Sequence, residues 1–207
     1  MFITSPRLSI PYYKGGKRNK IPNPNQPMVV TFMFVEWLRK NVFASVLLLF
    51  ARLYLGWEWM SAGWGKITGE GFSAGKFLEK AVANPVVSHD EIIYPTYTAF
   101  LKSFALPNVD LINFMIPYGE FLVGLGLILG CLTTAAGFFG VVMNFAFLYA
   151  GTVSSNPWMI MLTLFILISG RNAGYFGLDR YLYPYYDRMF HRTPPKTPVT
   201  PIHKKIA

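Results

Sequence analysis

The sequence predicts an all-α, polytopic membrane protein in which four transmembrane helices form a bundle. The first observation is composition: 53% of the 207 residues are hydrophobic and only 14% are charged, whereas soluble domains are roughly 25% charged. The second is the presence of four long apolar segments separated by short breaks. The third is the concentration of basic residues in both terminal regions, which is typical of a chain that crosses a membrane an even number of times.

Each predicted span follows from apolar length, since about 20 apolar residues cross a bilayer core. The segments lie at residues 42–66, 111–130, 132–152 and 157–173. The fourth segment is short unless it continues through Gly170. Because the breaks before the third and fourth segments are tight and uncharged, we expect the last three helices to be antiparallel neighbours.

The loop between the first two spans, residues 66–110, has structure of its own. Residues 74–84 and 96–105 each place apolar side chains on one helical face and polar ones on the other. Such segments are typical of helices that lie in a membrane interface. We therefore expect two interfacial helices in this loop.

The two ends of the chain are predicted to be tails. Residues 1–41 comprise a disordered basic tail and an interfacial segment, and residues 185–207 form a basic, proline-rich tail, because the prolines from Pro184 onward should end the last helix. Basic residues favour the cytoplasmic side, so both termini are expected inside and the 66–110 loop outside. The net charge of +9 then reflects topology and the anionic headgroups of the lipid bilayer, and nucleic acid is not needed to explain it.

Small and polar residues follow one face of each predicted span. On the first three helices this face carries Arg52 and Trp59, Glu120, and Asn144 respectively. Such faces meet inside a bundle because polar groups find partners only between helices. Arg52, Glu120 and Asn144 are expected near the midplane, which predicts an Arg52–Glu120 ion pair. This pair is either a structural clasp or part of a polar pocket or proton path.

Two further side chains could serve a pocket. Trp59 lies on the inner face and could form the floor of a site for a flat ring. Glu58 lies about 120° away from Arg52 around the first helix, in the outer third of the span. It faces either a second interface, a partner or water.

Other classes of site lack the residues they require. The three histidines lie outside the predicted spans, so no pair of them can ligate a membrane haem. We expect no metal site, because no His, Cys and carboxylate spacing suggests one, and a surface cluster at His89, Asp90 and Glu91. No phosphate-binding loop for a nucleotide is present. The single cysteine, Cys131, cannot form an internal disulfide or a redox pair.

Three blocks of sequence resemble the DoxX/DoxD family of small prokaryotic membrane proteins: RLYLGWEWMSAGWGKI, YGEFLVGLGLILGCLT and SGRNAGYFGLDRYLYP. They begin at Arg52, Tyr118 and Ser169. The resemblance covers residues 42–184 and implies a four-helix membrane bundle in a prokaryotic plasma membrane. For the DoxD branch it implies the membrane subunit of a thiosulfate:quinone oxidoreductase, which works with a second subunit that this chain does not contain.

Three functions follow as hypotheses. In the first, the chain is a quinone-interacting redox subunit: Arg52, Trp59 and Asn144 bind the quinone, Glu58 and Glu120 transfer protons, and a partner subunit or small reductant supplies electrons. In the second, it is a non-catalytic scaffold that recruits redox enzymes, marked by a dry Arg52–Glu120 clasp without a cavity. In the third, it is a small transporter, which would need a homo-oligomer because four helices enclose little room.

Overall fold

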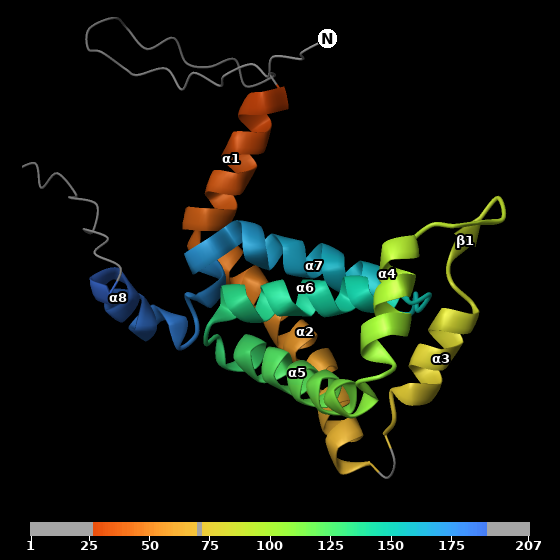
Figure 1. The fold of residues 1–207 in the computed structure, drawn as a ribbon. Coiled ribbons are helices and arrows are strands. Elements are labelled where there is room, and N and C mark those ends of the chain that lie inside the picture. Colours follow the sequence, from red (N-terminus) through yellow and green to blue (C-terminus); the bar gives the residue numbers. More distant parts are fainter. Residues whose placement is uncertain (1–26, 70–71, 190–207) are drawn as a thin grey trace, which may run out of the picture.

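The computed structural model describes residues 27–69 and 72–189, and these are mainly helical (Figure 1). The predicted spans fall on α2 (Val42–Thr68), α5 (Val109–Leu129), α6 (Thr133–Tyr149) and α7 (Asn156–Ser169). A 3₁₀ turn, η2 (Gly170–Gly174), continues α7. Asn41 begins α2 as its N-cap, since its side-chain oxygen accepts hydrogen bonds from the backbone N–H groups of Phe43 and Ala44.

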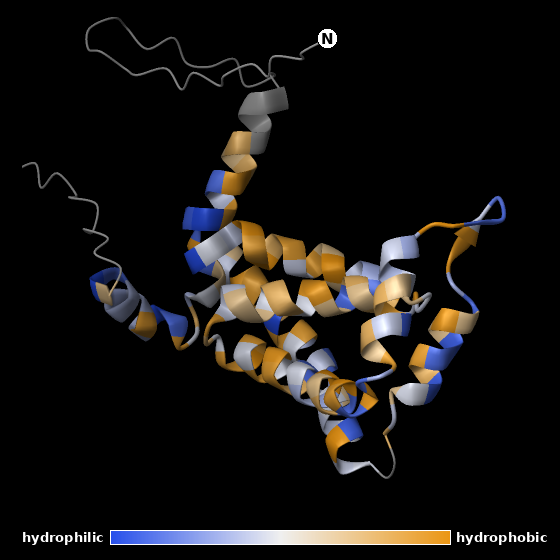
Figure 2. Cartoon of the chain, in the orientation of Figure 1, coloured by the Kyte–Doolittle hydropathy of each residue, from blue (hydrophilic) through white to orange (hydrophobic). Residues whose placement is uncertain are grey.

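The helices place an apolar surface outward. Exposed phenylalanines and leucines cover the bundle, and Figure 2 shows α5, α6 and α7 mostly in the hydrophobic colour. By length and composition α2 and α5 can cross a membrane, and a third span results if Asn156–Gly174 and α8 (Asp179–Met189), bent by 86°, count as one. At 17 residues α6 is shorter than a full span. The chain is a helical membrane protein, and the division into four spans stays a prediction.

Helices α2 and α5 form a tight contact because glycines on both helices let the two backbones approach each other. A Cβ built on Gly63 would lie 2.4 Å from the backbone nitrogen of Phe121, and one on Gly124 would lie 2.3 Å from that of Met60. Backbones approach this closely only where a side chain is missing. These contacts fix the axial register of the two helices.

The loop between α2 and α5 packs against one end of the bundle. It contains α3 (Gly75–Ala83), α4 (Pro95–Phe100) and a π-helical turn, η1 (Leu101–Ala105). The buried faces of α3 and η1 form a small core of their own, which includes Leu78, Ala81, Leu101 and Ala105. The backbone N–H of Ala74 donates to the side chain of Asn113 in α5 at 2.7 Å, which ties α3 to the bundle. A position at the outer membrane surface stays a prediction for these helices.

The all-α prediction missed a small β-hairpin between α3 and α4. Strands β1 (Val87–Ser88) and β2 (Glu91–Ile92) are antiparallel, and Val87 pairs with Ile92. The turn residues His89 and Asp90 have positive φ angles of 50° and 64°. A turn of this type is usually signalled by Asn-Gly or Asp-Gly, and the absence of glycine here hid it.

Helices α1 (Pro27–Lys40) and α8 lie at the end of the bundle opposite α3 (Figure 1). The expectation that Pro184 ends the last helix is wrong, because α8 runs through Pro184 to Met189. Pro184 lies inside α8, where it removes one backbone donor, and the helix continues on both sides of it. The tails predicted at residues 1–26 and 190–207 lie outside the described residues.

Candidate functional site

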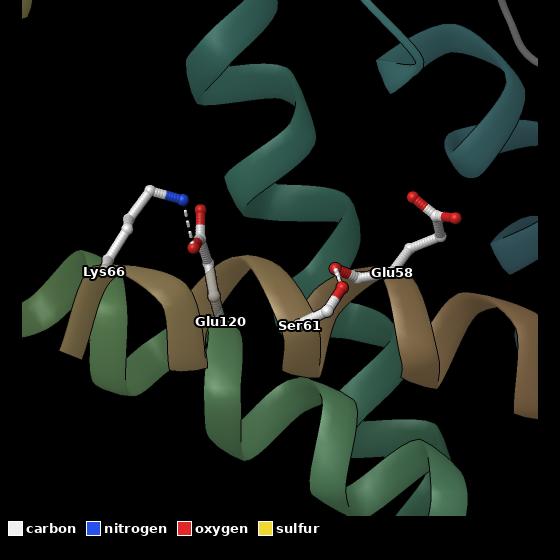
Figure 3. A network of polar contacts seen from close by, with 4 residues as sticks. All are labelled: Glu58, Ser61, Lys66 and Glu120. Atoms are coloured by element: carbon white, nitrogen blue, oxygen red, sulfur yellow. Dashed lines mark hydrogen bonds and ion pairs between the residues drawn. The ribbon is translucent and has the colours of Figure 1, made fainter. Parts of the chain in front are cut away.

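A buried ion pair joins α2 to α5. Lys66 Nζ donates a hydrogen bond to Glu120 Oε2 at 2.5 Å (Figure 3). The Glu120 side chain is only 3% exposed, whereas that of Lys66 is 29% exposed. The predicted Arg52–Glu120 pair is therefore wrong, and Lys66 takes the place of the arginine.

Arg52 instead binds backbone carbonyls at the other end of α2. Its Nη1 and Nη2 donate to the carbonyl oxygens of Ala173 and Phe176, each at 3.1 Å. Gly63, not Arg52, lies beside the turn of α5 that contains Glu120. At 1.5 Å per residue, Arg52 is roughly 15 Å away from Glu120 along the bundle axis. The two residues share a face of the bundle but not a depth.

The residues around Arg52 form a structural clasp, by which we mean Arg52, Gly130, Asn172 and Asp179. The Asp179 carboxylate accepts from the backbone N–H groups of Leu132 at 2.7 Å and residue 133 at 2.9 Å. It thereby caps the start of α6 from a distant part of the chain. Gly130 has a φ of 62°, and a Cβ there would lie 2.1 Å from Arg52 Nη1.

Asn172 ties the clasp to the junction between α1 and α2. Its Nδ2 donates to the carbonyl oxygens of Leu38 at 2.7 Å and Asn41 at 3.0 Å, and its Oδ1 accepts from Ser45 Oγ at 2.7 Å. Every side-chain hydrogen-bonding atom of this buried amide has a partner, so its role is to hold helices together.

At the opposite end of α2, the Lys66–Glu120 pair borders a cavity of about 370 Å³. This volume is in the range of small-molecule sites. The walls come from α2, α3, α5, α6 and the start of α7, so the cavity exists only when these elements pack. Its polar lining residues are Glu58, Trp59, Lys66, Glu120, Asn144, Thr152, Ser154, Ser155 and Asn156.

Two buried side chains in the cavity wall present unpaired polar atoms. Trp59 is 3% exposed and Asn144 is fully buried. Within the described residues, Trp59 Nε1 and both polar atoms of the Asn144 amide have no hydrogen-bond partner. Buried polar groups are rarely left unpaired, so these atoms are candidates for hydrogen bonds to a polar ligand or water in the cavity. Arg52 Nε and Thr133 Oγ1 also have no partner there, but they lie near the clasp.

Glu58 lines the same cavity but is separate from the ion pair. It is half-buried, and in Figure 3 its carboxylate stands away from Lys66 and Glu120. The Ser61 hydroxyl donates to the backbone carbonyl of Glu58 at 3.1 Å, and that bond leaves the carboxylate free of Ser61. Glu58 therefore offers a second carboxylate to the cavity, closer to solvent than Glu120.

The structure brings together Glu58, Trp59, Glu120 and Asn144 and separates Arg52 from them. Lys66 is the residue of the site that was not predicted from the sequence. The sequence did contain a signal for this role, because a lysine at the end of an apolar span must either pair with a buried group or extend to the membrane interface. No group of three His, Cys, Asp or Glu side chains that could hold a metal occurs in residues 27–69 and 72–189.

Comparison with known proteins gives one match. No curated protein and no solved structure matches the chain. A family model, that of DoxX, matches residues 47–152. This region is about half of the chain and contains Glu58, Trp59, Lys66, Glu120 and Asn144. The chain is a membrane protein that belongs to the DoxX family.

Proposed function

We propose that the protein is the membrane subunit of a quinone-linked redox system and that the cavity beside Lys66 and Glu120 holds the quinone ring. A partner protein or a small thiol or sulfur compound supplies the electrons. In this proposal the protein lies in the plasma membrane of a prokaryote with both termini in the cytoplasm.

One observation carries the proposal: Trp59 and Asn144, whose buried polar atoms have no partner in the described residues, belong to the wall of a cavity that also contains two carboxylates. A quinone ring is flat and carries two carbonyl acceptors. The indole N–H of Trp59 and the amide N–H of Asn144 are two donors without acceptors in the described part of the chain. The cavity residues therefore fit such a ring in both polarity and size.

A bound quinone supplies a two-electron acceptor that also takes up two protons on reduction. Trp59 and Asn144 bind and orient its carbonyl oxygens. Glu120 holds or releases a proton, with Lys66 compensating its charge at 2.5 Å. Glu58, which is half-buried, exchanges protons between the cavity and water. Arg52, predicted to bind the quinone, has only a structural part in this scheme.

The scaffold hypothesis is less well supported. Its mark is a fully paired clasp between Arg52 and Glu120 with no cavity. Arg52 and Glu120 do not pair, and a cavity lies beside Glu120. A scaffold needs neither a cavity nor unpaired buried donors.

Binding tests the proposal directly. The purified protein in detergent is titrated with a benzoquinone that carries no chain, and tryptophan quenching reports binding. Trp59→Phe keeps an aromatic ring and removes the donor, so the affinity should fall by roughly threefold to tenfold, the effect of one lost hydrogen bond. Trp57→Phe is the matched control, because Trp57 is 62% exposed and does not line the cavity. Equal affinities of the two variants, or no binding to the wild type, would refute the proposal.

Turnover tests the proton-transfer role of Glu58. Glu58→Gln keeps the shape of the side chain and removes its ionisation. Quinol formation by membranes that hold the protein, its partner and a thiol or thiosulfate donor should fall while the melting temperature stays near that of the wild type. Unchanged rates in a folded variant would remove Glu58 from the mechanism.

A further inference from the structure

A long apolar groove runs between α5 and α6. Its volume is about 790 Å³, and nearly all of its lining is apolar. Helices α5 and α6 form its length, and residues of α3, α4 and η1 close one end. Representative lining residues are Leu101, Met115, Leu122, Ala135, Phe139 and Val142.

The groove lies next to the polar cavity. Phe77, Ile116 and Phe147 line both. These three side chains therefore form the boundary between the polar cavity and the apolar groove. A polar space beside a long apolar one matches an amphiphile with one head and one chain.

The groove is long for an ordinary lipid chain. On α5 its lining extends from Ile116, which also lines the polar cavity, to Leu129. On α6 it extends from Phe147 back to Leu132. At 1.5 Å per residue these distances are roughly 20 Å. Half of a bilayer core is only about 15 Å thick. A chain that fills the groove therefore reaches beyond one leaflet, as a polyprenyl chain does.

The charges at the head end also select the occupant. The cavity contains the Glu58 and Glu120 carboxylates against the single ammonium of Lys66. Because Lys66 is already paired with Glu120, an anionic phosphate head would meet an uncompensated carboxylate. A neutral head that accepts hydrogen bonds from Trp59 and Asn144 meets no such repulsion.

We propose that the α5/α6 groove holds the isoprenoid chain of a quinone whose ring occupies the polar cavity, so that the substrate is a long-chain quinone taken up sideways from the bilayer. This inference rests on the proposed function for the identity of the head. The length of the groove and its position beside the cavity specify the chain.

Two probes separate the chain from the head: a benzoquinone with no chain and the same ring with a decyl chain. Leu122 is 61% exposed and lines the groove, so Leu122→Trp fills the groove without disturbing the core. This variant should lose roughly tenfold in affinity for the decyl quinone and keep its affinity for the chainless ring within about twofold. Leu164→Trp is the matched control, since Leu164 is an exposed helical leucine outside the groove.

The second variant, Val142→Trp, fills the groove from the α6 wall and should behave like Leu122→Trp. The sole cysteine gives a further measurement, because Cys131 lies at the far end of the groove. A chain that ends in a maleimide should label Cys131 in the wild type and in Leu164→Trp, and much more slowly in Leu122→Trp.

Each alternative has its own signature. If both probes bind the wild type and Leu122→Trp equally well, the groove does not hold the chain and only this inference fails. If neither probe binds the wild type, the quinone function itself fails, and this inference with it. A phospholipid that co-purifies with the wild type and is lost from Leu122→Trp would instead assign the groove to lipid. A change from dimer to monomer in that variant would assign it to a second copy of the chain.

Discussion

Removing Lys66 from the Lys66–Glu120 pair should reduce stability more than removing the charge of Glu120. Lys66→Met leaves the Glu120 carboxylate, 3% exposed, without its partner, whereas Glu120→Gln leaves Lys66, which is 29% exposed. A long lysine side chain near a helix end can turn its ammonium toward water. The glutamate is short and has no such path. The lysine variant should therefore be the less stable of the two.

The expected magnitudes follow from this difference in burial. Removing one partner of a buried pair costs about 3–5 kcal/mol, and we expect this for Lys66→Met. For Glu120→Gln, where the remaining charge reaches solvent, we expect about 1–2 kcal/mol, the cost of a lost charged hydrogen bond. The double variant Lys66→Met/Glu120→Leu should lie within about 1 kcal/mol of the wild type, because an apolar pair often replaces a buried ion pair without loss.

The free energy of unfolding is measured by reversible SDS titration of the purified protein in mild detergent, with helicity as the signal. The exchange Lys66→Glu/Glu120→Lys should recover part of the loss caused by either single reversal. Arg52→Glu/Glu120→Arg should recover none, because Arg52 is far from Glu120 and binds carbonyls. Rescue by the arginine exchange, or a larger loss in Glu120→Gln than in Lys66→Met, would refute the assignment.

Three further predictions concern other parts of the fold. Arg52→Met should lower the free energy of unfolding by about 2–4 kcal/mol, since the buried carbonyl of Ala173 and the part-buried carbonyl of Phe176 lose their donor. It should leave the affinity of the folded protein for the chainless quinone unchanged. Gly124→Ala should destabilise the protein by about 1–3 kcal/mol because the added Cβ would meet Met60. Gly65→Ala, where the added Cβ meets open space, should stabilise it by about 0.5–1 kcal/mol. Equal effects of the two variants in thermal melts would contradict the tight α2/α5 contact. Burial raises the pKa of the Tyr97 hydroxyl above its usual 10.0. The contribution of the neutral hydroxyl to stability is therefore complete below about pH 10 and is lost as the pH rises through the folded-state pKa. Tyr97→Phe should reduce the loss of stability above pH 10.

The sequence was sufficient for the helices because their signals are local. The apolar stretch of α2 and its capping Asn41 lie within one continuous segment, so composition and spacing locate the helix. The polar face of each span was equally predictable, since a period of 3.6 residues fixes which side chains point the same way. On that basis Trp59, Glu120 and Asn144 could be assigned to one interior before any tertiary contact was known.

Two features were harder to predict from the sequence: the turn at His89 and Asp90, and the helix that continues through Pro184. Each has a conformation that its residues disfavour locally. Contacts with parts of the chain outside any short stretch of sequence stabilise that conformation. The left-handed φ angles of His89 and Asp90 occur within a paired hairpin. Asp179, at the start of α8, is held by the backbone of residues 132 and 133, and this long-range contact fixes where α8 begins.

By itself the sequence determined that this is a membrane protein with polar helix faces turned inward, because hydropathy and angular position are properties of each segment alone. The tertiary structure decided which charges meet. A polar stripe gives the direction of a side chain around its helix but not its depth relative to a neighbour, and an ion pair requires both. The α2/α5 register is set by backbone contacts at Gly63 and Gly124. That register placed Lys66 beside Glu120 and left Arg52 roughly 15 Å away, where carbonyl oxygens receive it.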